Sequence, residues 1–203
     1  MITIIDYGCG NIRAFLNVFT RLNVPVVVAT KASDVIDASR IILPGVGAFD
    51  FVMQSFNNSG MRDIVERKVL LDKVPVLGVC AGMQILADSS DEGVEKGLSW
   101  IPGTVRMFDI DKVPYVTKIP HMGWNDINPV DSKLFMNLPA GSRFYFVHSY
   151  YYDPMSVQHS IATSNYGSDF SCAVAKENIY GVQFHPEKSH GNGLTLLKNF
   201  AEL

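Results

Sequence analysis

The sequence predicts an α/β fold with a mostly parallel central sheet flanked by helices and an additional β-rich portion. Two observations lead to this fold class. Up to residue 99, short β-branched runs alternate with segments of helical periodicity, as in a parallel sheet with crossover helices. From Trp100 to Val182, aromatic and β-branched runs follow one another between Pro and Gly residues. The length of 203 residues, without a break in composition, predicts a single domain, residues 1–203.

The first half begins with a strand over residues 2–6, which are apolar apart from Thr3. A helix is expected next, because five apolar side chains recur at helical spacing: Ile12, Phe15, Leu16, Phe19 and Leu22. Asn11 is its predicted N-cap, since an Asn side chain can accept a first-turn N–H. Further short strands are predicted over 25–29, 40–43 and 74–79, and helical segments between 50 and 70 on either side of 57–60.

The second half is predicted to be mainly β, with strands over 104–108, 143–147, 160–163 and 171–175. A final helix is predicted over 193–203, because apolar side chains again recur at helical spacing at Leu194, Leu196, Leu197 and Phe200.

The composition excludes several classes of protein. With 47% hydrophobic and 18% charged residues, the chain can bury about 70% of the surface that its unfolded form exposes, so it is not predicted to be disordered. The net charge of −3 argues against a nucleic-acid partner. No apolar run approaches the roughly 20 residues of a membrane helix. The first residues resemble a strand and not a signal peptide, so the expected location is cytoplasmic.

Cys80 lies between two glycines in the segment 78–82, Gly-Val-Cys-Ala-Gly, directly after a predicted strand. This is the nucleophile-elbow pattern with sulfur in place of a hydroxyl. Glycine on each side allows the sharp turn that projects the side chain above the sheet edge, and the start of a helix there would favour the thiolate. The alternative is a small buried hydrophobe, the usual role of a lone cysteine. Three cysteines, Cys9, Cys80 and Cys172, cannot form a disulfide framework.

His185 and Glu187 follow another apolar run, in the segment 180–188. In an extended backbone, residues two apart point to the same side, which would let the carboxylate orient the imidazole. Imidazole can take a thiol proton and return it to a leaving amine. A lone His-x-Glu is more often a surface pair, but its combination with a cysteine elbow favours catalysis. A zinc site made by Cys80, His185, Glu187 and His148 is an alternative that lacks paired ligand spacing.

The segment 44–49, Pro-Gly-Val-Gly-Ala-Phe, directly follows the strand predicted over 40–43. Acyl transfer requires backbone donors where the carbonyl oxygen becomes negative, each contributing about 3 kcal/mol. The glycines around Val46 would let its N–H turn toward that oxygen, and the N–H of Ala81 is the natural second donor. An ordinary Pro-Gly turn is the alternative, but the position at a strand end favours a site.

With these elements the sequence resembles the class I glutamine amidotransferases over nearly its whole length. The resemblance is carried by the segments 6–8 (Asp-Tyr-Gly), 10–11 (Gly-Asn), 44–49, 78–80, 82–84 (Gly-Met-Gln), 120–125 (Pro-His-Met-Gly-Trp-Asn), 146–150 (Phe-Val-His-Ser-Tyr) and 183–189 (Gln-Phe-His-Pro-Glu-Lys-Ser). The segments 6–8 and 121–125 are particular to the subgroup that supplies ammonia to a (β/α)8-barrel synthase.

This resemblance implies that the chain hydrolyses glutamine through a γ-glutamyl thioester on Cys80. His185 would act as acid and base, and Glu187 would orient it. The family pattern implies that glutamine is held by Gly47, Gln84, Glu92, His148, Ser149 and Tyr150, with Glu92 facing the α-ammonium group. It implies no cofactor and no metal ion.

The resemblance also implies a partner, a (β/α)8-barrel synthase subunit that forms a heterodimer with this chain and uses the ammonia to make imidazole glycerol phosphate in histidine biosynthesis. The matching positions that would face the partner are Asn11, Met122, Trp124 and Lys188. For Met122 and Trp124, a place in the core is the alternative.

Because ammonia without an acceptor is wasted, we expect the subunit to be nearly idle alone. The peptide around Val46 would face away at rest and turn when the partner binds its own substrate. Replacing Gly45 by proline would test this hypothesis.

Two departures from the family pattern are Ala81, where leucine is usual, and a loose acidic segment at 89–93. They suit a paralogue that supplies ammonia for the amidation of a surface-polysaccharide sugar, which is the first alternative. A non-catalytic partner-binding module is the second, although all three catalytic residue types are present. Cys9 and Cys172 have no base nearby in the sequence, and His159 and His190 are predicted to be solvated.

Overall fold

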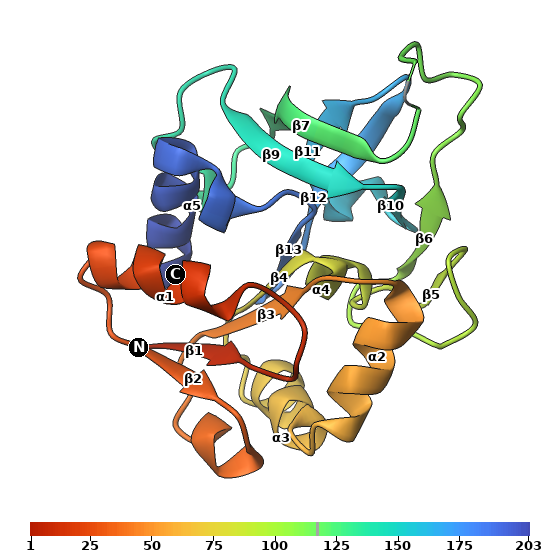
Figure 1. Ribbon diagram of the computed structural model, residues 1–203. Helices are drawn as coiled ribbons and strands as arrows, with labels where there is room; N and C mark the ends of the chain where they lie inside the picture. Colours follow the sequence, from red (N-terminus) through yellow and green to blue (C-terminus); the bar gives the residue numbers. More distant parts are fainter. Residues whose placement is uncertain (117) are drawn as a thin grey trace.

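A continuous eleven-stranded sheet forms the centre of the structure, a computed structural model that describes residues 1–116 and 118–203 (Figure 1). Its first part is parallel, with neighbouring strands in the order β2 (Val26–Ala29), β1 (Ile2–Ile5), β3 (Ile41–Gly45), β4 (Val76–Cys80) and β13 (Ile179–Val182). The C-terminal strand β13 therefore lies directly beside β4. This pairing brings the segment after β13 to the same sheet edge as Cys80.

The β-rich portion continues the same sheet. Beyond β13 lie β12 (Asp169–Lys176), β10 (Tyr150–Pro154), β6 (Gly103–Met107) and β5 (Ser89–Ser90), while β11 (Ser160–Asn165) pairs with β12 and β8 (Asn128–Pro129) pairs with β11. All these pairs are antiparallel except β5 with β6. A separate two-stranded antiparallel sheet consists of β7 (His121–Asp126) and β9 (Arg143–His148). The predicted fold class is confirmed.

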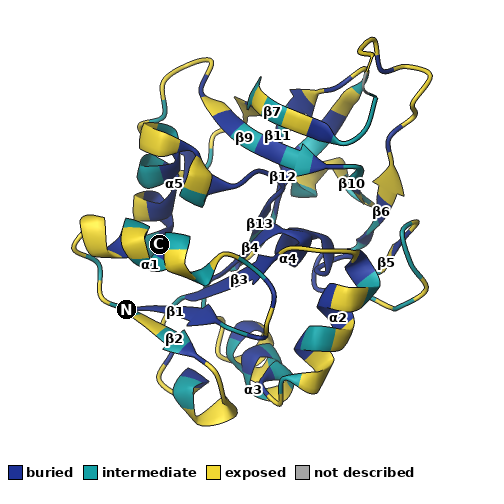
Figure 2. Cartoon of the chain, in the orientation of Figure 1, coloured by how far each residue is buried: buried dark blue, intermediate teal, exposed yellow. Residues whose placement is uncertain are grey.

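Helices cover both faces of the parallel part (Figure 1). On one face lie α1 (Ile12–Arg21) and α5 (His190–Glu202), and on the other lie α2 (Phe49–Asn58) and α3 (Arg62–Glu66). Successive residues of β1 point to opposite faces of the sheet. Ile4 packs with α1 and α5, while Ile5 packs with α2 and α3. The strands are buried and the outer helix faces exposed, as Figure 2 shows.

Shorter helical turns complete the chain. They are α4 (Ala81–Gln84), the π-helical turn η2 (Arg67–Leu71), and the 3-10 turns η1 (Ala32–Val35), η3 (Lys133–Phe135), η4 (Val157–His159) and η5 (Pro186–Lys188). Within the described residues, no helix has the length and apolar content needed to cross a bilayer.

Some predicted boundaries were wrong. The last helix begins at His190 and not at residue 193, because a polar first turn carries no apolar periodicity. Asn11 precedes α1 as expected, but its side chain makes no capping hydrogen bond. Its backbone carbonyl instead accepts from the N–H groups of Ala14 and Phe15, at 3.1 and 3.5 Å.

Candidate active site

The chain turns sharply at Cys80, the last residue of β4. Its backbone has φ 55° and ψ −117°, in a region that non-glycine residues rarely adopt. A Cβ at Gly82 would lie 2.0 Å from the carbonyl oxygen of Leu43, and one at Gly78 would lie 2.5 Å from the carbonyl oxygen of Gly82. Both glycines are therefore required by the close approach of neighbouring backbone, as the elbow pattern predicted.

The helix after the elbow is short. The element α4 has only four residues. A macrodipole is the sum of aligned peptide dipoles, so a single turn stabilises a thiolate little.

His185 and Glu187 form a buried pair. The distance from His185 Nδ1 to Glu187 Oε1 is 2.8 Å, and the two side chains are 3% and 1% exposed. The expected extended backbone was wrong, because β13 ends at Val182 and Pro186 opens the turn η5. The turn carries the carboxylate back under the ring. Ser189 secures it by donating its hydroxyl to the carbonyl of His185 at 2.6 Å.

The charge state of His185 follows from its neighbours. Burial lowers the pKa of the imidazole, but hydrogen bonding and charge from Cys80 and Glu187 outweigh it and raise the pKa to about 10. Nε2 is buried and has no other hydrogen-bond partner in the described part of the chain. These neighbours favour the imidazolium form of His185, in which Nε2 carries a proton that is available for transfer.

The neighbouring ends of β3 and β4 bring together the two expected backbone donors, the N–H groups of Val46 and Ala81. Gly45 pairs with Cys80, so the residues that follow them, Val46 and Ala81, stand next to each other at the sheet edge. Gly47 has φ 122°, which favours glycine. A Cβ at Gly45 would lie 2.2 Å from the backbone nitrogen of Gly82. Proline at this position would disrupt the elbow itself, so it cannot test the orientation of the Val46 peptide.

A cavity of about 280 Å³ opens in front of Cys80 and His185. It is lined by all the positions that the family pattern implies for glutamine, namely Gly47, Gln84, Glu92, His148, Ser149 and Tyr150, together with Val46 and Ala81. Two further lining residues, Pro120 and Val147, were missed. Val147 belongs to β9 and Pro120 directly precedes β7, and their apolar side chains gave no chemical signal.

Glu92 is fixed at one edge of this cavity. Its Oε2 accepts a hydrogen bond of 2.8 Å from the backbone N–H of Phe49, the first residue of α2. Asp50 accepts hydrogen bonds from the N–H groups of Val94 and Glu95, at 3.0 to 3.1 Å. These bonds attach the acidic segment firmly to the helix despite its loose match to the family pattern.

Two buried side chains next to the cavity, His121 and Gln183, were not singled out from the sequence. His121 Nδ1 lies 2.9 Å from His148 Nε2, and Gln183 Nε2 lies 3.8 Å from Cys80 Sγ. Both residues stand inside segments that carried the family resemblance. Only the three-dimensional contacts reveal that their polar groups approach the site.

The two buried histidines should make stability depend on pH. Burial lowers the pKa of His121 to about 4, and burial with the neighbouring His121 lowers that of His148 to about 3. An unfolded histidine takes up its proton near pH 6.5. Protons therefore favour the unfolded state as the pH falls below that value. These two histidines alone would lower the free energy of unfolding by roughly 3 kcal/mol between pH 7.5 and 5.5. The raised pKa of His185 offsets about half of this loss, so we expect a net fall of roughly 1 kcal/mol, measured in urea.

His185 opposes part of this trend, because its raised pKa gives stability that is fully present below pH 6.5 and is lost progressively as the pH rises from about 6.5 to about 10. The variant His121→Gln keeps a donor for His148 and should lose most of the pH dependence, because the remaining contributions of His148 and His185 nearly cancel. His190→Gln, at an exposed position, should show all of it. Equal stability of the unsubstituted chain at both pH values would contradict the prediction.

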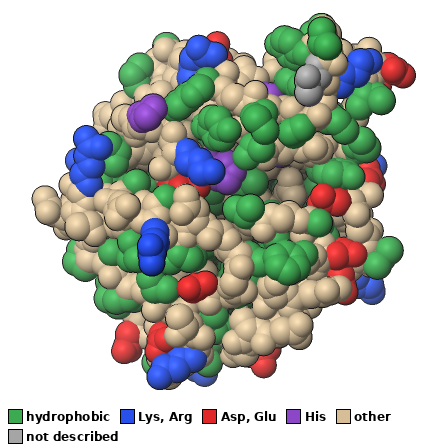
Figure 3. Space-filling model, viewed as in Figure 1, with side chains coloured by type: hydrophobic (Ala, Val, Ile, Leu, Met, Phe, Trp, Pro, Cys, Tyr) green, Lys and Arg blue, Asp and Glu red, His purple; other side chains and the backbone are tan. Residues whose placement is uncertain are grey.

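The four residues expected to face a partner are at the surface. Met122 and Trp124 are 62% and 39% exposed, which excludes the core alternative for both. Asn11 and Lys188 are also exposed, with Lys188 Nζ 5.9 Å above the ring of Tyr145. Trp124 and Met122 belong to β7, and hydrophobic side chains gather on the face that carries this strand (Figure 3).

The remaining cysteines and histidines have other environments. Cys9 and Cys172 are buried, and burial raises the pKa of the Cys172 thiol. The prediction of solvated histidines was only partly right, since His159 is half-buried and the exposed ring of His190 stacks on Trp124 at 5.2 Å. Among the described residues, no three His, Cys, Asp or Glu side chains converge as a metal site would require.

Known proteins resemble this chain over its full length. The family model "Glutamine amidotransferase class-I" matches residues 3–203. The imidazole glycerol phosphate synthase subunit HisH of Bdellovibrio bacteriovorus is 58% identical, and that of Leptospira borgpetersenii is 48% identical, each over 100% of both chains. A solved structure of a glutamine amidotransferase has a TM-score of 0.74 at 16% identity, covering 100% of this chain and 99% of that one, and supports the fold.

Proposed function

Because this chain belongs to the class-I glutamine amidotransferase family and, within it, to the HisH subunits, we propose that Cys80, His185 and Glu187 hydrolyse the side-chain amide of glutamine. The chain is the glutaminase subunit of imidazole glycerol phosphate synthase and serves histidine biosynthesis. The observation that carries the proposed roles is the buried 2.8 Å pair of His185 and Glu187, which shares one cavity edge with the strained Cys80.

The reaction proceeds in two acyl transfers. The Cys80 thiolate attacks the side-chain carbonyl carbon of glutamine, and the N–H groups of Val46 and Ala81 stabilise the resulting oxyanion. His185 Nε2 gives its proton to the leaving nitrogen, so ammonia departs and a γ-glutamyl thioester remains on Cys80. Water then attacks the thioester while His185 takes the proton of that water, and glutamate leaves with the thiolate restored.

Glutamine lies in the cavity of about 280 Å³ in front of Cys80. Glu92 offers its carboxylate to the α-ammonium group, while Gly47, Gln84, His148, Ser149 and Tyr150 surround the rest of the substrate. The single hydrogen bond from Phe49 to Glu92 Oε2 supports this role, since it orients the carboxylate and leaves its charge for a cationic partner.

The partner that receives ammonia is a (β/α)8-barrel synthase subunit of the HisF kind, bound as a heterodimer. Exposed apolar side chains of β7 beside the cavity support a protein partner on this face. The peptide of Val46 turns to its donating orientation only in the complex loaded with the acceptor, which keeps the isolated subunit nearly idle.

An acceptor experiment tests the assignment against the sugar-amidating alternative. The chain is mixed with its genome-neighbour barrel subunit, glutamine labelled with ¹⁵N in the amide, and either the imidazole glycerol phosphate precursor or a keto-sugar. We expect ¹⁵N in imidazole glycerol phosphate. Transfer of ¹⁵N to the keto-sugar alone would contradict the assignment.

Trp124 should contribute strongly to partner binding. Large aromatic side chains often dominate association energies, and this one is exposed in the isolated chain. We expect Trp124→Ala to weaken binding of the barrel subunit by about 2 kcal/mol, roughly 30-fold, measured by calorimetric titration. The melting temperature of the isolated chain should be almost unchanged.

The matched control is Met155→Ala, which removes another exposed apolar side chain, 80% exposed and directly after the end of β10. It should bind the partner as tightly as the unsubstituted chain. Equal losses of affinity for both variants, or collapse of the isolated Trp124→Ala chain, would contradict the proposed interface.

A further inference from the structure

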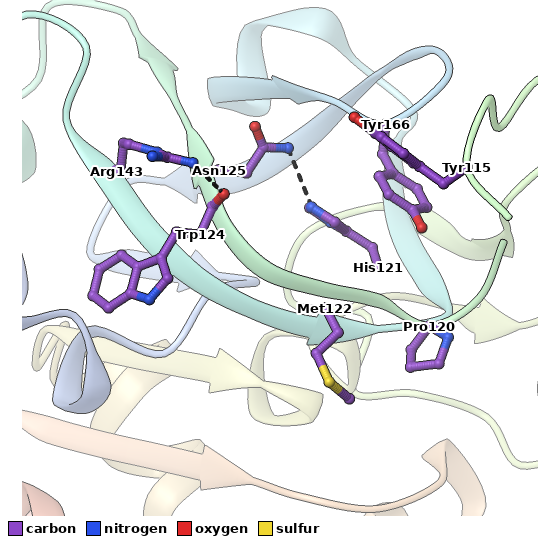
Figure 4. A pocket seen from close by; sticks show the side chains of 8 residues that line it. All are labelled: Tyr115, Pro120, His121, Met122, Trp124, Asn125, Arg143 and Tyr166. Atoms are coloured by element: carbon purple, nitrogen blue, oxygen red, sulfur yellow. Dashed lines mark hydrogen bonds between the residues drawn. The ribbon is translucent and has the colours of Figure 1, made fainter. Parts of the chain in front are cut away.

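A chain of hydrogen bonds runs inward from an open surface pocket of about 570 Å³ that is lined partly by β7. Figure 4 shows Asn125 at this pocket with its amide directed at the ring of His121. Asn125 Nδ2 lies 3.1 Å from His121 Nε2, and His121 Nδ1 lies 2.9 Å from His148 Nε2. His148 Nδ1 lies 2.7 Å from the carbonyl oxygen of Tyr150, at the wall of the glutamine cavity.

The chain continues from that carbonyl to the catalytic sulfur. Gln84 Nε2 lies 3.3 Å from the same carbonyl oxygen of Tyr150 and 3.0 Å from Gln183 Oε1. Gln183 Nε2 lies 3.8 Å from Cys80 Sγ, within the longer range of hydrogen bonds to sulfur. Gln183 is fully buried, so water does not compete for its amide.

The direction of each bond is determined by the Tyr150 carbonyl, because a carbonyl oxygen can only accept. Gln84 must therefore present its NH₂ group to it, and the same group donates to Gln183 Oε1. With its oxygen engaged in this way, Gln183 must turn its own NH₂ group toward Cys80. The orientation of the amide beside the sulfur thus follows from the network around it.

The Tyr150 carbonyl also determines the orientation and tautomer of both imidazoles. His148 donates from Nδ1 to the Tyr150 carbonyl, so its Nε2 accepts from His121 Nδ1, and His121 Nε2 accepts from Asn125. Both rings are then neutral with one proton on Nδ1, in agreement with their lowered pKa values. The second donation of Asn125, to the carbonyl of Asn165 at 2.8 Å, holds the outer end of the chain.

We propose that Gln183 is a positioning residue for the nucleophile, which donates a hydrogen bond to the sulfur of Cys80 and is held in that orientation by Gln84 and the Tyr150 carbonyl. This deepens the proposed function and rests on Cys80 being the nucleophile. A neutral donor beside the sulfur stabilises the thiolate over the thiol, because a hydrogen bond to an anion is stronger than one to a neutral acceptor. It also directs the sulfur into the cavity.

Other titratable groups around the sulfur do not replace this donor. His185, oriented by Glu187, supplies the proton for the leaving group and the positive charge. Burial, followed by the nearby Cys9 and Cys80, raises the pKa of Tyr7 well above the usual value, so Tyr7 remains neutral. Tyr7 donates its hydroxyl to the carbonyl of Pro44.

The test is the pH dependence of the alkylation of Cys80 by iodoacetamide in the full-length chain, quantified by mass spectrometry of the peptide that contains Cys80. Gln183→Met keeps the size of the side chain and removes the donor. We expect the midpoint of alkylation to move up by about one pH unit. Gln84→Met retains Gln183 without the group that orients it, and should move the midpoint in the same direction by less. This second variant decides the question if Gln183→Met fails to fold.

The control is Asn199→Leu, which removes another buried amide, one that donates to the carbonyls of Leu134 and Met136 at 3.0 and 2.6 Å. It should lower the melting temperature and leave the alkylation midpoint unchanged. An unchanged midpoint in Gln183→Met, or an equal shift in Asn199→Leu, would overturn the proposal. Because alkylation requires no glutamine, its outcome is separate from failure of the glutaminase assignment, which the ¹⁵N experiment detects.

Discussion

Replacing Cys80 by alanine should lower the rate of glutamine hydrolysis roughly 10⁴-fold or more, measured as glutamate formed by the complex with the barrel subunit. The reason is that the proposed reaction passes through a covalent bond to this sulfur. The remaining donors and His185 can bind glutamine but have no other nucleophile positioned at the strained turn. The fold should be retained, because alanine keeps the Cβ atom of cysteine and removes only the sulfur.

The control for this loss is Cys172→Ala, which removes the buried thiol of β12. That sulfur lies in the core and has no role in the proposed reaction, so the rate should be close to that of the unsubstituted chain. A Cys80→Ala chain that hydrolyses glutamine at a normal rate would contradict the proposed nucleophile.

Alanine at Gly82 should have the largest effect on stability. Its Cβ would lie 2.0 Å from the carbonyl oxygen of Leu43 and 3.0 Å from backbone atoms of Leu43 and Pro44. Backbone cannot move aside as the end of a flexible side chain can, so β3 or the elbow must shift. We expect the free energy of unfolding to fall by about 3 kcal/mol or more, measured by urea denaturation.

Gly191→Ala provides a matched control with the same change of side chain. Gly191 lies in the first turn of α5, and a Cβ there would meet no atom within 4 Å. Alanine has a higher helix propensity than glycine, so the stability of this variant should be unchanged or higher by up to about 1 kcal/mol. Equal stability of the Gly82→Ala and Gly191→Ala chains would show that the elbow tolerates a side chain.

Local patterns in the sequence predicted the alternation of strands and helices and the sharp turn at Cys80. They also predicted that His185 and Glu187 act together, but for the wrong geometric reason. The prediction placed both side chains on one face of an extended strand. In the structure, Pro186 begins a 3-10 turn that brings the Glu187 carboxylate under the ring of His185. Periodicity does not distinguish these arrangements, because each needs only a separation of two residues.

Contacts between distant segments could not be predicted in this way. The hydrogen bond from Gln183 to Cys80 joins residues 103 positions apart, and the pairing of β13 with β4 that creates it is a property of the whole sheet. The pair of His121 and His148 likewise depends on the register of β7 with β9. No local pattern in either segment specifies that register.

The most direct measurement of the central claim is the trapping of the covalent intermediate. The complex of this chain with its barrel subunit and acceptor is mixed with glutamine, quenched in acid during turnover and digested for mass spectrometry. We expect a γ-glutamyl thioester on the peptide that contains Cys80, removed by treatment with hydroxylamine, as the proposed mechanism requires. Steady release of ammonia with the acyl group on another residue, or on none, would contradict it.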